Sequence, residues 1–380
     1  VTVTNAVAIT GTTAALTAAL VTPATKVTAA SATVTISDAA AVSVEATALS
    51  AIGGATAGTV TVTNAVAITG SADEVTAALV TDTTKVEAAT ATVTIMQSPF
   101  GTLNATDLSA IGGKTSGTVT VMSSLMITGT ASELTAALVT DATKVIASIA
   151  RVQILGTPTV AELNEIAAQT NGVVTATLAP SSLADLAALN TGAADVITIT
   201  VNDDAATPVT AAALSTLGGK TAGTVTVTNA VAITGTASEL TAALVTNATK
   251  VVASTATVTV TDTPTVDELN AIAAATNGVV TATISGTADV LAGLDETGNA
   301  YTVTVTGTAT VADLNTVNAA TTVTVDATGV TAITGSAAEL TTLVAATGLT
   351  LAPNFTATVT DAATVAQLTA ITNATTGLVT

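Results

Sequence analysis

Internal repetition constrains this chain more than any other feature of its sequence. The block Gly58–Gly70 (GTVTVTNAVAITG) recurs without change at Gly223–Gly235. A second pattern, Thr265–Ile272 (TVDELNAI), is echoed at Thr159–Ile166, Thr310–Val317 and Thr364–Ile371. The two patterns together fill about fourteen units of roughly 21–32 residues, a spacing typical of solenoid proteins. Each unit is too short to close a core of its own, so we expect the units to stack.

Every unit opens with a predicted β-strand. Val60 and Val62 alternate with Thr61 and Thr63, and the same alternation returns in later units. A period of two in β-branched residues indicates a strand with one buried and one outward face.

A short helix is predicted after the strand. Four segments match the capping box, in which a Ser or Thr oxygen accepts from the third helical amide and a Glu accepts from the cap's own amide. The four pairs are Ser71 with Glu74, Thr130 with Glu133, Thr236 with Glu239, and Ser336 with Glu339. Apolar pairs such as Leu134 and Leu138 then lie on one helix face.

Two residue types are expected at the helix ends. Glycines such as Gly53-Gly54, Gly172 and Gly278 are predicted to end helices in the left-handed conformation. Lysines recur at equivalent places, as at Lys85 and Lys250, where we expect them to offset the dipoles of terminal carbonyls.

These elements predict an α/β repeat fold. Short helices are unstable alone, whereas stacked units form a parallel sheet backed by helices, and crossovers between parallel strands are right-handed. We therefore expect residues 1–380 to form a single right-handed solenoid of about fourteen coils. Val1–Ile9 repeats Val60–Ile68. We expect both ends to be uncapped, as in a segment of a longer repetitive protein or filament.

Composition excludes several classes of function. The chain has a net charge of −19, which opposes nucleic-acid binding. It has neither Cys nor His, so Ser-His-Asp and Cys-His catalysis are excluded. Every long apolar run is interrupted by Thr, Asn, Gly or a charge, which argues against membrane insertion. Carboxylates such as Glu162 and Glu268 hold the third helical position, where capping explains them. We therefore expect no enzyme and no cofactor.

The acidic turn at Asp203 and Asp204 is a weak candidate for a metal site. Calcium takes six to eight oxygen ligands, and this turn offers few of them. A solvated turn is the preferred interpretation.

The outward threonines support a second hypothesis. Thr residues on alternate strand positions of stacked units make a grid of hydroxyls and methyls that could bind ice or a polysaccharide. This Thr face would include Thr2, Thr4, Thr61, Thr63, Thr226 and Thr228. The opposing interpretation is that Thr is a strong β-former that tolerates water.

The Val-Thr-Val-Thr strands joined to units such as Thr159–Thr177 (TVAELNEIAAQTNGVVTAT) resemble the repeat tracts of giant secreted or cell-surface proteins of bacteria, cyanobacteria especially. The geometry is also similar to leucine-rich repeats, although their consensus is missing. The resemblance implies an extracellular or cell-surface protein that forms filaments or adheres. The glycine- and aspartate-rich calcium nonapeptides that often accompany such proteins do not occur here.

The sequence thus predicts an extracellular structural filament or cell-surface fibre segment. Its expected partner is itself, through head-to-tail or lateral assembly, because a heterologous contact that does not close propagates. The alternative is a ligand-binding solenoid that uses the Thr face.

Overall fold

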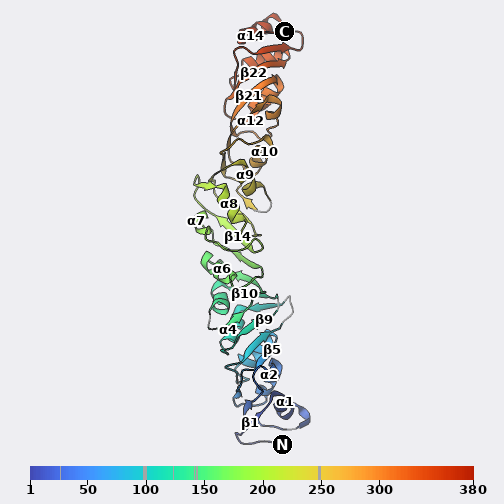
Figure 1. Cartoon of the computed structure of the whole chain (residues 1–380), viewed down its shortest axis with the longest axis vertical. Coiled ribbons are helices and arrows are strands. Elements are labelled where there is room, and N and C mark those ends of the chain that lie inside the picture. The colour runs from blue at the N-terminus through green and yellow to red at the C-terminus, as the bar shows by residue number, and fades with distance from the viewer. Residues whose placement is uncertain (26, 97–100, 123, 141, 143, 247–249) are drawn as a thin grey trace. The chain divides into compact units, whose positions relative to one another are not determined.

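The structure is a computed structural model of the 380-residue chain. It describes residues 1–25, 27–96, 101–122, 124–140, 142, 144–246 and 250–380. The chain divides into two compact units: the first comprises residues 1–179 and 188–198, and the second residues 180–187 and 199–380. In Figure 1 the first unit is coloured from blue to green and most of the second from yellow-green to red.

The described residues of the first unit form three sheets, and every strand pair in them is parallel. In order of pairing, the first sheet consists of β1 (Ala8–Gly11), β2 (Thr33–Ile36), β4 (Val60–Val62) and β6 (Val86–Glu87). The second consists of β3 (Ser43–Glu45), β5 (Ala67–Gly70), β7 (Thr92–Ile95), β9 (Val119–Val121) and β11 (Val145–Ile146). The third consists of β8 (Thr102–Asn104), β10 (Met126–Thr130), β12 (Arg151–Leu155), β13 (Val174–Thr177) and the first half of β14 (Val196–Val201).

Helices alternate with these strands along the chain. The α-helices of the first unit are α1 (Thr13–Leu16), α2 (Ala46–Gly54), α3 (Ala72–Leu79), α4 (Ala105–Gly112), α5 (Ala131–Leu134) and α6 (Val160–Ala167). The π-helices η1 (Thr17–Val21) and η3 (Thr135–Val139) extend α1 and α5, and a 3-10 turn, η2 (Pro23–Thr25), follows η1.

The second unit has the same parallel pattern. The second half of β14 pairs with β16 (Val225–Val227), which pairs with β18 (Val251–Val252). A longer series consists of β15 (Pro208–Thr210), β17 (Ala232–Gly235), β19 (Thr257–Val260), β20 (Val280–Thr287), β21 (Ala300–Thr310) and β22 (Val325–Gly335), and β22 pairs with both β23 (Leu349–Leu351) and β24 (Thr356–Val359). Its helices are α7 (Leu183–Leu186), α8 (Ala211–Gly218), α9 (Ala237–Leu240) with η4 (Thr241–Val245), α10 (Val266–Ala274), α11 (Ala288–Leu291), α12 (Val311–Ala320), α13 (Ala337–Val344) and α14 (Val365–Ala374).

Sheets end and begin at fixed places in the repeat. β6, β11 and β18 each end a run of pairing and contain two residues, whereas β3, β8 and β15 each start a run and lead directly into a helix. A Lys with positive φ precedes each of the three ending strands: Lys85, Lys144 and Lys250, at φ 46°, 46° and 49°. Very short edge strands with Lys nearby are how natural sheets avoid pairing with other chains.

Alternate strand residues and one face of each helix form the core. Val60 and Val62 are buried in β4 while Thr61 between them is partly exposed, and Leu49 and Ile52 of α2 are fully buried. Since a two-turn helix is unstable alone, burial of this face is what holds it helical. The single Tyr of the sequence, Tyr301, is also buried, and this burial, with Glu296 nearby, raises its pKa to about 12.

The α/β prediction is confirmed at the level of parallel-only sheets that alternate with helices. For the glycines, the expected position is confirmed at Gly53-Gly54, because α2 ends at Gly54, but the expected left-handed conformation was wrong, because neither residue has a positive φ. Among the described residues the glycines with positive φ are Gly156, Gly298 and Gly307, none of which was predicted.

The lysine expectation is met at Lys220, whose Nζ donates to the carbonyl of Ala187 at the end of α7 (3.1 Å). Lys85 instead donates to Ala57, in a turn (2.7 Å).

Candidate functional site

A Thr-x-Gly turn that bonds one repeat to the preceding one recurs through the structure. Thr56 illustrates it: its hydroxyl donates to the carbonyl of Ala32 (2.5 Å) and accepts from the amide of Gly58 (3.1 Å). Equivalent bonds are made by Thr115 to Ala91 and Gly117, Thr170 to Ala150 and Gly172, Thr276 to Ala256 and Gly278, and Thr375 to Phe355 and Gly377. Thr56, Thr115 and Thr375 are buried, so each hydroxyl satisfies backbone groups that water does not reach freely.

The glycine of this turn is required by close packing between repeats. A Cβ on Gly58 would lie 2.1 Å from the carbonyl oxygen of Ala32. The corresponding distance is 2.2 Å or less at Gly117, Gly172, Gly278 and Gly377. Gly172 and Gly278 were expected to end helices; close approach to a neighbouring backbone is their actual role. The sequence signal was the recurrence of Thr-x-Gly just before a Val-rich strand.

Aspartates supply a second bond between repeats. Asp38 accepts from the amide of Thr13 (2.7 Å), which is the first residue of α1 in the preceding repeat. In the second unit Asp203 accepts from Leu183 (2.8 Å), Asp262 from Ala237 (2.8 Å) and Asp361 from Ala337 (2.7 Å). Each carboxylate therefore satisfies a free amide at a helix start.

This geometry accounts for Asp203, one of the two weak metal candidates. Its carboxylate caps α7, and Asp204 accepts through its backbone oxygen from the amide of Thr207 (3.0 Å). Within the residues that the structure describes, no group of three or more acidic side chains is arranged to hold a metal ion.

Capping boxes form at all four of the segments named from the sequence: Ser71 with Glu74, Thr130 with Glu133, Thr236 with Glu239, and Ser336 with Glu339. Three more pairs, found at the Thr-x-x-Glu/Gln starts of other helices, are Thr159 with Glu162, Thr265 with Glu268, and Thr364 with Gln367. Each box satisfies two amides that would otherwise lack a partner at the start of a helix.

Glu239 shows the geometry of the box at the start of α9. Its carboxylate accepts from the amide of Thr236 (2.9 Å), and its own amide donates to the Thr236 hydroxyl (3.2 Å). The same carboxylate would lie 3.2 Å from a Cβ built on Gly235, so the residue before the cap has little room for a side chain. Glu239 is therefore fixed by the helix start that it stabilises, as the sequence predicted.

Hydrogen bonding also affects the ionisation of some of these glutamates. The amide of the cap residue, and then its hydroxyl, lower the pKa of Glu133, Glu162 and Glu339 by hydrogen bonding to the carboxylate. Such bonds favour the charged form of the acid. These glutamates are held in the charged form by the same hydrogen bonds that fix the helix starts.

The Thr face is divided into short rows. Thr61 lies in register between Thr35 and Glu87, and Thr226 lies between Thr200 and Val252. Thr2 pairs with Thr28, and Thr4 is exposed. Thr63 and Thr228 each use the hydroxyl to bond a backbone carbonyl of the preceding repeat, at 3.1 and 3.2 Å.

A longer row was not named from the sequence. Thr210, Thr234, Thr259 and Thr281 are in register on β15, β17, β19 and β20, and Ala300 ends the row. The row depends on which residues of neighbouring strands pair, and the alternation of Val and Thr within one strand does not specify that pairing.

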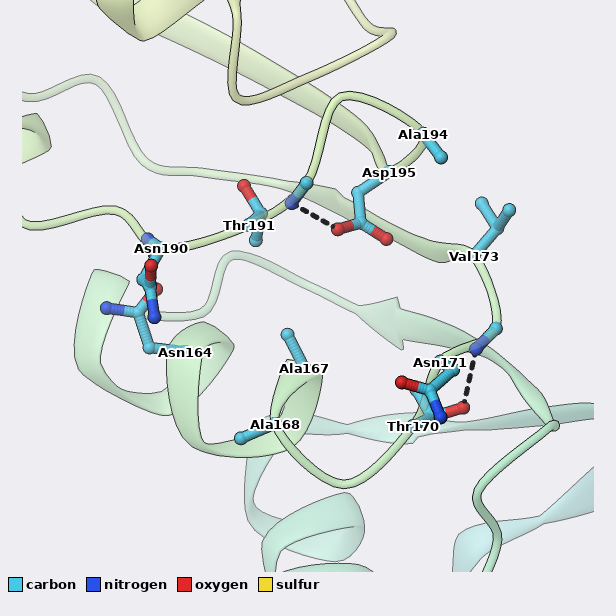
Figure 2. Close-up of a pocket in the computed structure, with 12 residues that line it drawn as sticks. Asn164, Ala167, Ala168, Thr170, Asn171, Val173, Asn190, Thr191, Ala194 and Asp195 are labelled. Atoms are coloured by element: carbon cyan, nitrogen blue, oxygen red, sulfur yellow. Dashed lines mark hydrogen bonds between the residues drawn. The ribbon is translucent and has the colours of Figure 1, made fainter.

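A hollow of about 280 Å³ lies in the first unit, between the end of α6 and residues 190–195. Dashed lines in Figure 2 join the Asp195 carboxylate and the Thr170 hydroxyl each to a backbone amide. Asn164 donates to the carbonyl of Ala188 (2.8 Å) and accepts from the amide of Asn190 (2.7 Å). Asp195 accepts from the amides of Gly192 (2.7 Å) and Val174 (2.8 Å). The polar groups of the hollow therefore order the chain around it.

Comparison with known proteins does not assign a family. No protein-family model matches the chain, and no curated protein matches it in sequence. None of the helices in the described ranges has both the length and the apolar character needed to span a bilayer.

Proposed function

We propose that this chain is a segment of an extracellular structural filament or cell-surface fibre. In this proposal the repeats wind as a right-handed solenoid of about fourteen coils, uncapped and continuous over residues 1–380. The observation that carries the proposal is the regular bonding of each repeat to its neighbour by parallel strands, Thr-x-Gly turns and aspartate caps.

Such bonding suits a mechanical role. Several polar groups bond one repeat to another: Thr56 bonds the backbone of the preceding repeat, and Asp38 caps the helix of the repeat before its own. In stacked repeats of this kind each unit depends on its neighbours for stability. The resemblance of the Thr159–Thr177 pattern to bacterial surface-protein repeats supports a location outside the cell. The sequence has no His and no Cys, so it lacks two of the side chains that most often act as bases or nucleophiles in catalysis.

The proposal includes self-assembly, either head to tail or side by side. Two strand pairs in the first unit illustrate how the chain binds its own repeats. Strand Thr33–Ile36 pairs with Val60–Val62, and strand Thr92–Ile95 pairs with Val119–Val121 in the same register. A surface that binds a near-identical repeat within one chain has the right chemistry to bind one from another copy.

Electron microscopy and fibre diffraction of the native material test this function. Unbranched fibres with an axial repeat near 4.8 Å, the spacing between strands, are expected. The Gly58→Ala variant should lose axial order, because the new Cβ meets the Ala32 carbonyl, whereas Gly54→Ala, which meets no atom within 4 Å, should not. Isolated short particles with no fibres would contradict the proposal.

The row Thr210, Thr234, Thr259 and Thr281 favours one alternative, a ligand-binding face for ice or a polysaccharide. Methyls and hydroxyls spaced by about 4.8 Å along a sheet offer a regular surface. Ice-recrystallisation and glycan-binding assays on the wild type and Thr259→Lys distinguish the two functions, because Lys would interrupt the row on an exposed position. No activity in either assay would remove this alternative.

A further inference from the structure

One corner of the first unit departs from the residue types that the repeats otherwise use. The segment Val119–Gly129 (VTVMSSLMITG) aligns with Val60–Gly70 (VTVTNAVAITG), so that Met122 and Met126 replace Thr63 and Ala67. The segment Lys144–Gln153 (KVIASIARVQ) aligns with Lys85–Thr94 (KVEAATATVT), so that Ile146, Ile149 and Arg151 replace Glu87, Thr90 and Thr92. In the second unit the matching positions hold Thr228, Ala232, Val252, Thr255 and Thr257.

The substituted residues are neighbours in the structure. The amide of Met122 donates to the carbonyl of Ile95 (3.1 Å), the last residue of β7, and Met96 is the next residue in the chain. Thr120 is in register with Ile146, and Met126 with Arg151. The guanidinium of Arg151 donates to the carbonyl of Ser124 (3.4 Å). We call the set Met96, Met122, Met126, Ile146, Ile149 and Arg151 the Met–Ile patch.

Four apolar side chains of the patch are open to solvent. Met96 is 52% exposed, Met122 58%, Ile146 47% and Ile149 50%. It contains all three methionines of the sequence and its only arginine. Single exposed apolar residues are ordinary, but a contiguous group on the order of a few hundred Å² marks an interaction site. Met adapts its shape to a partner, and Met and Arg are enriched in protein interfaces.

Charge identifies the partner. A chain of net charge −19 repels its own copies over most of its surface. At this corner Ile146 stands where the aligned repeat has the acidic Glu87, and Arg151 adds a positive charge. The corner is therefore less acidic than the aligned one, so two copies repel each other less there and can bury their exposed apolar side chains against one another. We propose that the Met–Ile patch is the lateral contact through which one copy of this chain binds a second copy. This inference rests on the proposed filament function and names its lateral interface.

Cysteine cross-linking of the full chain tests the contact directly, because the sequence has no Cys and each variant carries a single thiol. Ile149→Cys places the thiol in the patch, and the matched control Thr90→Cys places it at the aligned exposed position. A short bis-maleimide should yield several-fold more covalent dimer from Ile149→Cys than from Thr90→Cys. Equal yields would overturn the proposal.

Sedimentation velocity of a second set of variants measures self-association without any cross-linking. Met122→Thr, Ile146→Glu and Ile149→Thr, combined, introduce the residues found at the aligned positions Thr63, Glu87 and Thr90, so folding should be kept. Self-association should weaken by roughly tenfold for each anchor lost, while the control that combines Val252→Thr and Val290→Thr in the second unit leaves it unchanged. A wild type that stays monomeric, or a triple variant that associates normally, would refute the lateral contact.

Electron microscopy distinguishes an error in the lateral-contact proposal from an error in the filament proposal. If both hold, the triple variant forms single fibres where the wild type forms bundles. If the fibres of the wild type and of the triple variant bundle equally, the patch is not the lateral contact, but the filament proposal still stands. Absence of fibres in the wild type would remove the filament function, while the dimer would still be read from sedimentation.

Discussion

Replacing Thr56 by Val isolates the contribution of one Thr-x-Gly turn. Val has the shape and the β-branching of Thr, so packing and side-chain entropy change little. What disappears is the hydroxyl, which donates to the Ala32 carbonyl (2.5 Å) and accepts from the Gly58 amide (3.1 Å). Thr56 is 7% exposed and Ala32 fully buried, so water does not readily replace either bond.

The magnitude follows from the two backbone groups that lose a partner. A buried donor or acceptor left unsatisfied costs about 1–3 kcal/mol. Gly58 is only partly buried, so its amide can recover part of this by hydration. We expect Thr56→Val to reduce the free energy of unfolding by about 2–4 kcal/mol. For a cooperative unit of 150–250 residues this corresponds to a lower Tm by roughly 4–16 °C.

Denaturant unfolding followed by circular dichroism measures this difference. The control is Thr61→Val, the same chemical change on the outer face of β4, where we expect a change within about 0.5 kcal/mol. If both variants unfold at the same denaturant concentration as the wild type, the turn hydroxyl does not stabilise the repeat and the reasoning is refuted.

Three further predictions use other parts of the repeat. Gly58→Ala should lower Tm sharply because its Cβ would lie 2.1 Å from a carbonyl oxygen, whereas Gly54→Ala, with open space, should keep or slightly raise Tm in thermal melts. Thr135→Val should stabilise the chain in denaturant titrations by up to about 1 kcal/mol, since its buried hydroxyl has no partner among the described residues; a destabilised variant would contradict this. The lowered pKa of Glu162 means that its stabilisation is complete above about pH 4.5 and is lost as pH falls through the folded-state pKa. Glu162→Gln should therefore show a smaller loss of Tm between pH 5 and 3 than the wild type, because Gln367 already serves in the same kind of box; equal losses would show that Glu162 is not responsible.

One pentapeptide occurs four times in the sequence and shows that local sequence alone does not decide the type of helix. The pentapeptide Thr-Ala-Ala-Leu-Val forms π-helices at Thr17–Val21, Thr135–Val139 and Thr241–Val245. The same five residues at 76–80 continue α3, an ordinary α-helix, up to Leu79. Leu precedes the first three copies and Val precedes the fourth. An identical local sequence thus adopts two backbone forms, and its surroundings decide between them.

Local chemistry was sufficient to predict the strands and the helix starts named from the sequence. The alternation at Val60–Thr63 predicts a strand because the side-chain period of a strand is two. The pairs Ser71 with Glu74 and Thr236 with Glu239 predict helix starts because both partners of each capping box lie within three residues. These interactions form between residues that are close in the chain, so the amino-acid order contains all the information they need.

Only the tertiary structure decided which groups meet across repeats. The partner of Thr56 is 24 residues away and that of Asp38 is 25 residues away. The role of Gly58 depends on a carbonyl in the preceding repeat, and the Met–Ile patch exists because strand register brings Met126 beside Arg151. Alternation fixes which face a side chain occupies, but register fixes its neighbour, and register is set by the packing of whole repeats.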